Sequence, residues 1–169
     1  MSRYRPPQTK GSKFITRTGW QALKDELDEL WKVKRPQVTQ AVSEAAAQGD
    51  RSENAEYIYG KKQLREIDSR VRFLRQRLEG MVIVSETPTD QKRIFFGAWV
   101  TLEDEAGKEL TYRIVGPDEF DATQGLISMD SPLAKVLFKK TIDDEVSIEA
   151  PGGRRSYVVV AISYRDLGD

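Results

Sequence analysis

The 169-residue chain contains no cysteine and no histidine. Disulfide bonds, thiol nucleophiles and imidazole bases are therefore excluded, as are zinc sites built from these ligands. Long apolar runs are also missing, and no stretch approaches the roughly 18 residues of a membrane span. The first residues show no apolar run after their charges, so a signal peptide is not expected. We expect a soluble cytoplasmic protein whose chemistry depends on carboxylate, hydroxyl, Lys, Arg or Tyr side chains.

Apolar residues are scarce and charged residues abundant, at 38% and 32% of the chain. This composition indicates either a compact core that carries a highly solvated extension or a partly disordered chain. The net charge is zero, but residues 1–81 hold 17 basic and 11 acidic residues, whereas residues 101–169 hold 8 and 14. A basic half joined to an acidic half predicts two modules with different partners.

The first half of the chain predicts a long helical hairpin after a disordered arm at residues 1–15. Thr16 is a plausible N-cap for a helix that ends at Gly49, with a kink expected at Pro36. A second helix starts near Asp50 and ends between Gly80 and Val84. Its apolar residues alternate in steps of three and four, as in a coiled-coil seam: Leu64, Ile67, Val71, Leu74, Leu78 and Met81. Residues 16–84 are therefore predicted to form an antiparallel coiled coil on the order of 45 Å long.

The second half predicts a sheet domain. Residues 85–92 are polar, contain Pro88 and indicate a linker. Residues 93–169 then show short runs of period two separated by turn residues, together with one short helix after Ser131 and Pro132. The predicted fold class is α+β, with an antiparallel sheet and one helix in the second domain.

The turn between the two predicted helices contains two acidic residues, Asp50 and Glu53. At a helix start, residues three apart lie on the same face. The pair can form a capping box, in which Asp50 accepts from the first amides and Glu53 reaches back. It can also form part of a Mg²⁺ site, which would need further ligands from another molecule. The spacing alone leaves both interpretations open.

The second helix carries seven basic residues between Lys61 and Arg77, against two acidic ones. Lys61, Arg65, Arg72 and Arg75 lie on one ridge beside the seam, which is either a solvated face or a stripe that follows the phosphates of a single strand. Trp20 and Trp31 are interpreted as packing residues. In the second domain, Asp130, Ser131 and Pro132 indicate a helix cap or a docking contact.

Together these segments resemble the Gre family of bacterial transcript cleavage factors over about residues 14–165. The most specific motif is GDRSENAEY at the predicted tip; the others are WKVKRPQV, KKQLREIDSRVR, FFGAWV, RIVG and ISMDSPLAKVLFKK. The basic segment KKQLREID favours one of the two main branches of the family. The resemblance implies that the second domain is similar to FKBP-type isomerases.

The resemblance also implies a function and its residues. The second domain would dock through Asp130, Ser131 and Pro132 on bacterial RNA polymerase at the rim of its secondary channel. Asp50 and Glu53 would reach the active centre and help to hold a Mg²⁺ ion shared with the polymerase, which then cleaves its own backtracked transcript. Lys61, Lys62 and Arg65 would contact the extruded 3′ end of the nascent RNA. The chain would not be an enzyme by itself, would hold no cofactor stably alone, and would be a monomer without a membrane partner.

Three other functions are compatible with parts of the pattern. A regulator or inhibitor of the same fold could enter the same channel without stimulating cleavage, although the Asp50 and Glu53 pair favours stimulation. A prolyl isomerase would rest on similarity of fold alone. Direct binding of duplex DNA ranks low, because no helix-turn-helix or other base-reading module is present.

Overall fold

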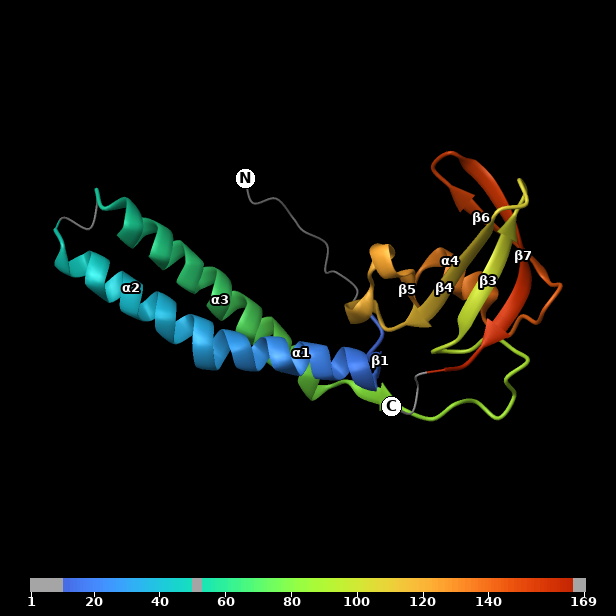
Figure 1. Cartoon of the computed structure of the whole chain (residues 1–169), viewed down its shortest axis with the longest axis horizontal. Coiled ribbons are helices and arrows are strands. Elements are labelled where there is room, and N and C mark those ends of the chain that lie inside the picture. Colours follow the sequence, from blue (N-terminus) through green and yellow to red (C-terminus); the bar gives the residue numbers. More distant parts are fainter. Residues whose placement is uncertain (1–10, 50–52, 166–169) are drawn as a thin grey trace, which may run out of the picture. The chain divides into compact units, whose positions relative to one another are not determined.

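The computed structural model describes residues 11–49 and 53–165. The chain divides into two compact units, one at Thr18–Met81 and the other comprising Val82–Asp169 together with Met1–Arg17. The first unit is helical and the second contains the sheets, so the predicted α+β class is confirmed (Figure 1). Across the described residues, none of the helices combines the length and apolar character that crossing a membrane requires.

The first predicted helix is interrupted by a π-helical segment. Helix α1 spans Arg17–Glu29, the π segment η1 spans Leu30–Lys34, and α2 spans Arg35–Ala47. The N–H of Arg35 donates to the carbonyl of Leu30, five residues earlier. Pro36 follows directly and has no N–H to donate, so the wider turn lies where the regular hydrogen-bond ladder would fail. The predicted interruption at Pro36 therefore takes the form of a π segment before the proline.

Helix α3, at Ala55–Glu79, runs back beside α2 and η1 and closes the hairpin (Figure 1). Its buried residues include Ile67, Val71 and Leu74, which confirms the centre of the predicted seam. The first arm contributes Leu23, Leu27, Val38 and Ala45 to the buried residues. Two ion pairs cross the hairpin, from Arg35 to Asp68 and from Arg70 to Glu26, each with a shortest distance of 2.7 Å.

Trp31 does not lie in the seam, although packing was expected for it. Its side chain is 43% exposed, and the guanidinium groups of Arg35 and Arg75 lie 5.3 and 4.4 Å from the centre of its ring. Guanidinium groups are attracted to the electron-rich face of an indole. Arg75, one of the predicted ridge residues, is thus engaged by the hairpin itself.

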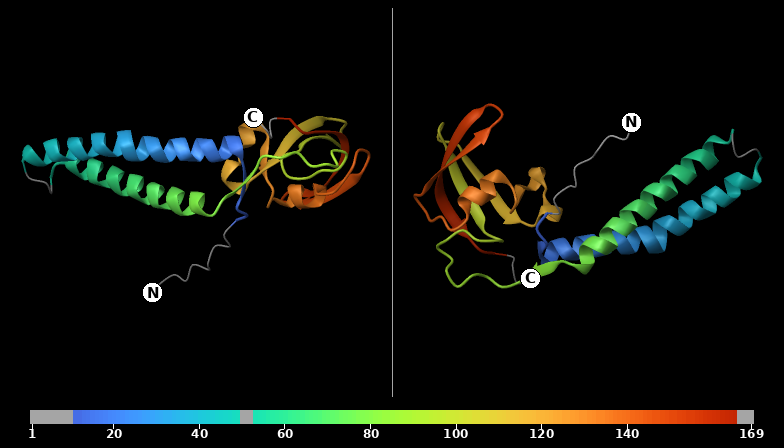
Figure 2. Two further views of the ribbon diagram at one scale, coloured as in Figure 1. Left: turned by 90° about the horizontal axis from the view of Figure 1, so that it is seen from below. Right: turned by 180° about the vertical axis from the view of Figure 1, so that it is seen from behind.

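The larger sheet of the second unit has five strands in the order β5-β4-β3-β7-β6, which Figure 1 labels. Figure 2 shows this sheet from two further sides. The strands are β3 at Trp99–Asp104, β4 at Glu109–Val115, β5 at Leu126–Ser128, β6 at Glu145–Ala150 and β7 at Gly153–Ser163. The β4–β5 pair is parallel, whereas a wholly antiparallel sheet was predicted. The chain reaches β5 through two short 3-10 turns, at Pro117–Glu119 and Ala122–Gln124. This longer connection permits the parallel pairing.

Helix α4, at Pro132–Leu137, completes the core of this unit. Ala134 and Leu137 on the helix are fully buried with Val100, Ile114 and Val159 on the strands. The predicted cap is confirmed, because the Ser131 hydroxyl oxygen accepts from the Ala134 N–H at 3.2 Å.

A second, two-stranded sheet differs from the arm predicted at residues 1–15. Strand β1, at Phe14–Thr16, pairs in parallel with β2 at Val82–Val84. Ile15 and Thr16 are buried, and the Phe14 ring lies 6.4 Å from that of Phe96. Residues 11–16 therefore belong to the folded second unit, while the remainder of the predicted arm lies outside the described residues.

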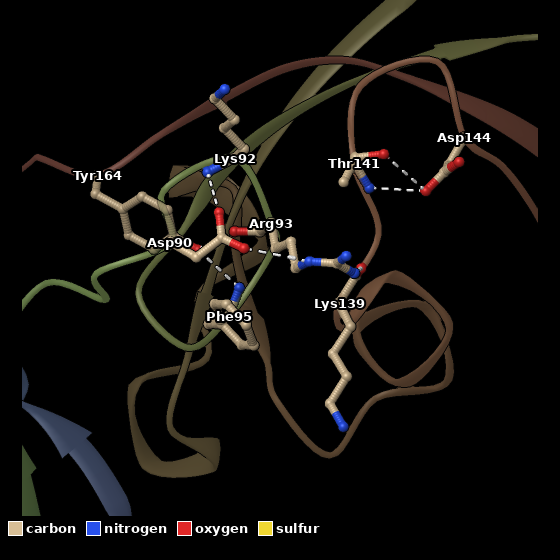
Figure 3. Close-up of polar contacts among 8 residues, drawn as sticks. All are labelled: Asp90, Lys92, Arg93, Phe95, Lys139, Thr141, Asp144 and Tyr164. Carbon is tan, nitrogen blue, oxygen red and sulfur yellow. Dashed lines mark hydrogen bonds and ion pairs between the residues drawn. The ribbon is translucent and has the colours of Figure 1, made fainter.

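The predicted linker at residues 85–92 contains neither helix nor strand, and its end is anchored to the sheet domain (Figure 3). Asp90 accepts from the Lys92 N–H at 3.1 Å and pairs with the Arg93 guanidinium at 3.2 Å. The Tyr164 hydroxyl, just after β7, accepts from the Phe95 N–H at 2.8 Å and donates to the Arg93 carbonyl at 2.5 Å. Burial of this hydroxyl raises the pKa of Tyr164 above its ordinary value.

Candidate functional site

The start of α3 is fixed by Asn54 rather than by Asp50. The Asn54 side-chain oxygen accepts from the Tyr57 N–H at 3.1 Å, and its side-chain nitrogen donates to the Ala45 carbonyl at 2.7 Å. Because α3 begins at Ala55, Glu53 precedes the helix and cannot be the third residue of a capping box. The capping-box interpretation of Asp50 and Glu53 is therefore wrong, and so is the argument that the pair shares a helical face.

Glu53 lies exposed in the turn before the cap. The Tyr57 N–H, one of the first amides of α3, donates to Asn54, and no hydrogen bond among the described residues involves the Glu53 carboxylate. Asp50 lies outside the described residues, and the role of the pair stays a prediction. The described residues contain no group of three or more acidic side chains that could hold a metal ion. A carboxylate oxygen suits Mg²⁺, but two carboxylates fill only part of an octahedral shell, and a partner must supply the rest.

The predicted basic patch consists of Lys61, Lys62 and Arg65, all exposed on α3. Among the described residues, none of these three cations lies in an ion pair. Lys62 and Arg65 border the same open groove of about 540 Å³, whereas Lys61 lies outside that groove. The structure therefore brings two of the three residues together on one surface.

The predicted docking segment has three residues in different environments. Asp130 is half-buried, and its carboxylate accepts from the Ser12 N–H at 2.8 Å and from the Ser12 hydroxyl at 2.5 Å. Ser131 caps α4, and Pro132 is exposed at the first position of that helix. Asp130 thus holds the N-terminal segment, and a docking role for the three residues stays a prediction.

Glu119 is a structural residue that the sequence analysis missed. Its carboxylate accepts from the N–H groups of Thr16 and Gly116 at 3.0 and 2.9 Å, and also from the Thr16 hydroxyl. Thr16, predicted as an N-cap, directly precedes α1. No sequence pattern connects residues more than one hundred positions apart, so this contact required the structure.

Phe73 is the second residue that the analysis missed. Its side chain is 47% exposed and borders the groove that also contains Lys62 and Arg65. The available signal was its position, because Phe73 lies one residue before Leu74 and therefore outside the seam of α3, among basic residues.

Both units match models of one family. Residues 13–83 match the model described as transcription elongation factor, N-terminal, and residues 88–164 match that of transcription elongation factor, GreA/GreB, C-term. A helical hairpin followed by a sheet domain, each matched along most of its length, places the chain among transcription elongation factors. The chain belongs to the GreA/GreB family.

Curated relatives indicate the branch of the family. Transcription elongation factor GreB of Pseudomonas aeruginosa is 63% identical over 97% of this chain and 98% of its own length. The GreB proteins of Xanthomonas axonopodis and Yersinia pestis are 56% and 58% identical, covering 99% and 94% of this chain and 100% and 92% of their own lengths. The resemblance is therefore to GreB, the branch that the basic segment KKQLREID favours.

Solved structures of the family show more distant similarity. The structure of GreA factor homolog 1 of Thermus thermophilus is 27% identical, with a TM-score of 0.40, and the match covers 89% of this chain and 97% of that one. GreA/GreB from Nitrosomonas europaea is 18% identical, with a TM-score of 0.40 and coverage of 90% and 100%.

Proposed function

We propose that this transcription elongation factor enters the secondary channel of bacterial RNA polymerase and stimulates the polymerase's own cleavage of backtracked transcripts. The observation that carries the proposal is the exposed Glu53 carboxylate, which lies before the Asn54 cap and takes no part in starting α3. An exposed acidic side chain that forms no hydrogen bond or ion pair with the other described residues, in the turn of a long hairpin, is available to a partner's active centre. Rescue of arrested complexes in the cytoplasm follows from this activity.

In this proposal Asp50 and Glu53 supply carboxylate oxygens to a site that the polymerase completes. A Mg²⁺ ion held there would stabilise the attacking and leaving oxygens during cleavage. The chain itself supplies charge and position, and the catalytic activity belongs to the polymerase. Asp130, Ser131 and Pro132 would anchor the second unit at the channel rim, and Lys61, Lys62 and Arg65 would contact the 3′ segment of the RNA.

The test replaces Asp50→Asn and Glu53→Gln together in the full-length chain. The amides keep the size and hydrogen-bonding capacity of the side chains but remove the charge that a cation needs. We expect polymerase binding to persist and cleavage of RNA in backtracked complexes to fall by at least about tenfold, a loss of about 1.4 kcal/mol in transition-state stabilisation. RNA length on denaturing gels measures cleavage, and co-migration with polymerase measures binding.

Gln48→Glu and Gln37→Glu are matched controls, because both side chains are exposed on the first arm and neither change removes an acid. Both controls should cleave like the wild type. Wild-type cleavage by the double variant would rule out the carboxylate assignment. A wild-type chain that binds polymerase without stimulating cleavage would instead identify the channel regulator of the same fold.

A further inference from the structure

Two exposed aromatic side chains lie on the same outward face of α3 as the basic groove. Tyr59 and Phe73 are 67% and 47% exposed, and they are 14 residues apart, or about 21 Å along a helix. Tyr59, Lys62, Glu66, Ser69 and Phe73 follow one another in steps of three and four, which places them on a single stripe. This stripe runs separately from the buried seam at Ile67, Val71 and Leu74.

The groove at the Phe73 end of the stripe is shallow and open. It measures about 540 Å³ and is lined by Lys62, Arg65, Glu66, Ser69, Arg70 and Phe73. Lys62 and Arg65 lie in none of the ion pairs among the described residues, so an anionic chain can approach them, whereas the charge of Arg70 is paired with Glu26. The hydroxyl of Ser69 adds a neutral hydrogen-bonding group.

Arg70 holds the Phe73 ring in place. The Arg70 guanidinium donates to both carboxylate oxygens of Glu26, at 2.7 and 3.0 Å, and lies 5.3 Å from the centre of the Phe73 ring. A ring supported by an anchored guanidinium loses little further freedom when a ligand stacks on its exposed side. The aromatic surface is therefore preorganised.

We propose that Phe73 and Tyr59 are stacking platforms for unpaired bases of a single strand whose phosphates contact Lys62 and Arg65. Aromatic side chains interleaved with cations are the means by which proteins hold single-stranded nucleic acid without reading its sequence. The identification of the strand as the extruded RNA rests on the proposed function. Phe73 is 18 residues beyond the first residue of α3, about 27 Å along the helix, so only long extruded segments would reach it.

The decisive experiment separates stacking from charge by using the full-length chain without polymerase. Fluorescence anisotropy at low salt measures binding of a labelled oligoadenylate of about twelve nucleotides and of an abasic strand with the same ribose-phosphate backbone. Phe73→Ala should weaken oligoadenylate binding at least about fivefold and leave abasic binding unchanged. Phe73→Tyr, which keeps the ring, should bind like the wild type.

Two further variants make the result specific. Replacing Lys62 and Arg65 with Ala should weaken binding of both strands and flatten the salt dependence, since phosphate contacts release counterions. Val33→Ala removes a 41% exposed apolar side chain from the first arm and should leave both affinities unchanged. Circular dichroism confirms that each variant keeps its helices.

Several outcomes would overturn the stacking proposal. They are equal affinity of the wild type for the two strands, undetectable binding of either strand, and a Phe73→Ala variant that binds oligoadenylate normally. If Phe73→Ala binds oligoadenylate normally but co-migrates less with polymerase in a separate binding assay, the stripe is assigned to a protein contact instead. Cleavage is measured in a separate assay. A wrong assignment of Asp50 and Glu53 would therefore not change the RNA-binding result, and a wrong stacking proposal would not change the assignment of the two acids.

Discussion

Asn54 performs two tasks with one side chain. Its oxygen caps α3 through the Tyr57 N–H, and its nitrogen donates to the Ala45 carbonyl near the end of α2. The Ala45 carbonyl also accepts from the Gln48 N–H at 3.2 Å, so the bond from Asn54 is its second hydrogen bond and ties the end of one arm to the start of the other. Glu53, the neighbouring residue, is thereby left exposed in the turn before the helix.

Replacing Asn54 tests this double role. Asn54→Ala should lower the free energy of unfolding of the hairpin by about 1–2 kcal/mol, because both the cap and the bond to Ala45 are lost. Asn54→Ser retains a capping oxygen, but its side chain is too short to reach Ala45. Its free energy of unfolding should therefore lie between those of the wild type and Asn54→Ala. Thermal unfolding followed by helical circular dichroism measures the change. Identical melting of Asn54→Ala and Asn54→Ser would show that the Ala45 bond contributes alone.

At the scale of elements, periodic patterns were predictable and local exceptions were not. The alternation of three and four in α3 correctly identified Ile67, Val71 and Leu74 as buried, since burial imposes that spacing. The predicted start of α3 near Asp50 is too early. Asp and Asn are both favoured N-cap residues, and only the structure shows that Asn54 caps the helix. Pro36 indicated an interruption without specifying a π segment.

Strand β1 escaped prediction for a different physical reason. Three residues, Phe14–Thr16, are too short to show a period, and their pairing with Val82–Val84 depends on residues far away in the sequence. The parallel pairing of β5 is likewise a tertiary property. For the site, the composition of the tip and of the basic helix was readable, and so was the position of Phe73 outside the seam, whereas the Asp130 contact with Ser12 was not.

Gly60 on α3 lies close to Val42 on the other arm of the hairpin. A Cβ atom there would lie 2.5 Å from Cγ2 of Val42, a β-branched side chain with little rotamer freedom. Gly60→Ala should therefore destabilise the hairpin by about 1 kcal/mol, because overpacking exceeds the gain in helix propensity. Adding Val42→Ala should relieve the overlap and raise the melting temperature above that of Gly60→Ala. If Gly60→Ala alone is more stable than the wild type, the prediction is wrong, and the two arms move apart enough to accommodate the added methyl group.

The Arg35–Asp68 ion pair should make the stability of the hairpin decrease at acidic pH. The hydrogen bond from the Arg35 guanidinium lowers the pKa of Asp68 below its ordinary value. A depressed folded-state pKa contributes stability that is present above the unfolded value, about 3.9, and is lost as the pH falls through the folded value. The melting temperature should therefore decline below about pH 4, and Asp68→Asn should decline less steeply. Parallel curves for the two proteins would assign the acid sensitivity to other carboxylates.

At the scale of the whole molecule, charge and structure divide the chain in different places. The helical unit at Thr18–Met81 holds 12 basic and 11 acidic residues and is nearly neutral, whereas five of the basic residues lie in Met1–Arg17, which belongs to the same unit as the acidic residues 101–169. The sheet unit also includes residues 11–16, which Asp130 and Glu119 hold through Ser12 and Thr16. A substitution at Asp130 therefore affects two things at once, the predicted docking surface and the attachment of the N-terminal segment.

A pair of variants separates these effects of Asp130. If Asp130 and Pro132 contact the polymerase, replacing both with Ala should raise the protein concentration needed for half-maximal cleavage by at least about tenfold, a loss of about 1.4 kcal/mol in binding, while saturating protein restores the maximal rate. Ser12→Ala removes the hydroxyl bond to Asp130 but leaves its carboxylate in place, so the half-maximal concentration should stay near that of the wild type. An equal shift in Ser12→Ala would show that Asp130 acts through the N-terminal segment. Loss of the maximal rate at saturation would place the docking residues in the cleavage step itself, because uniform binding alone does not change that rate.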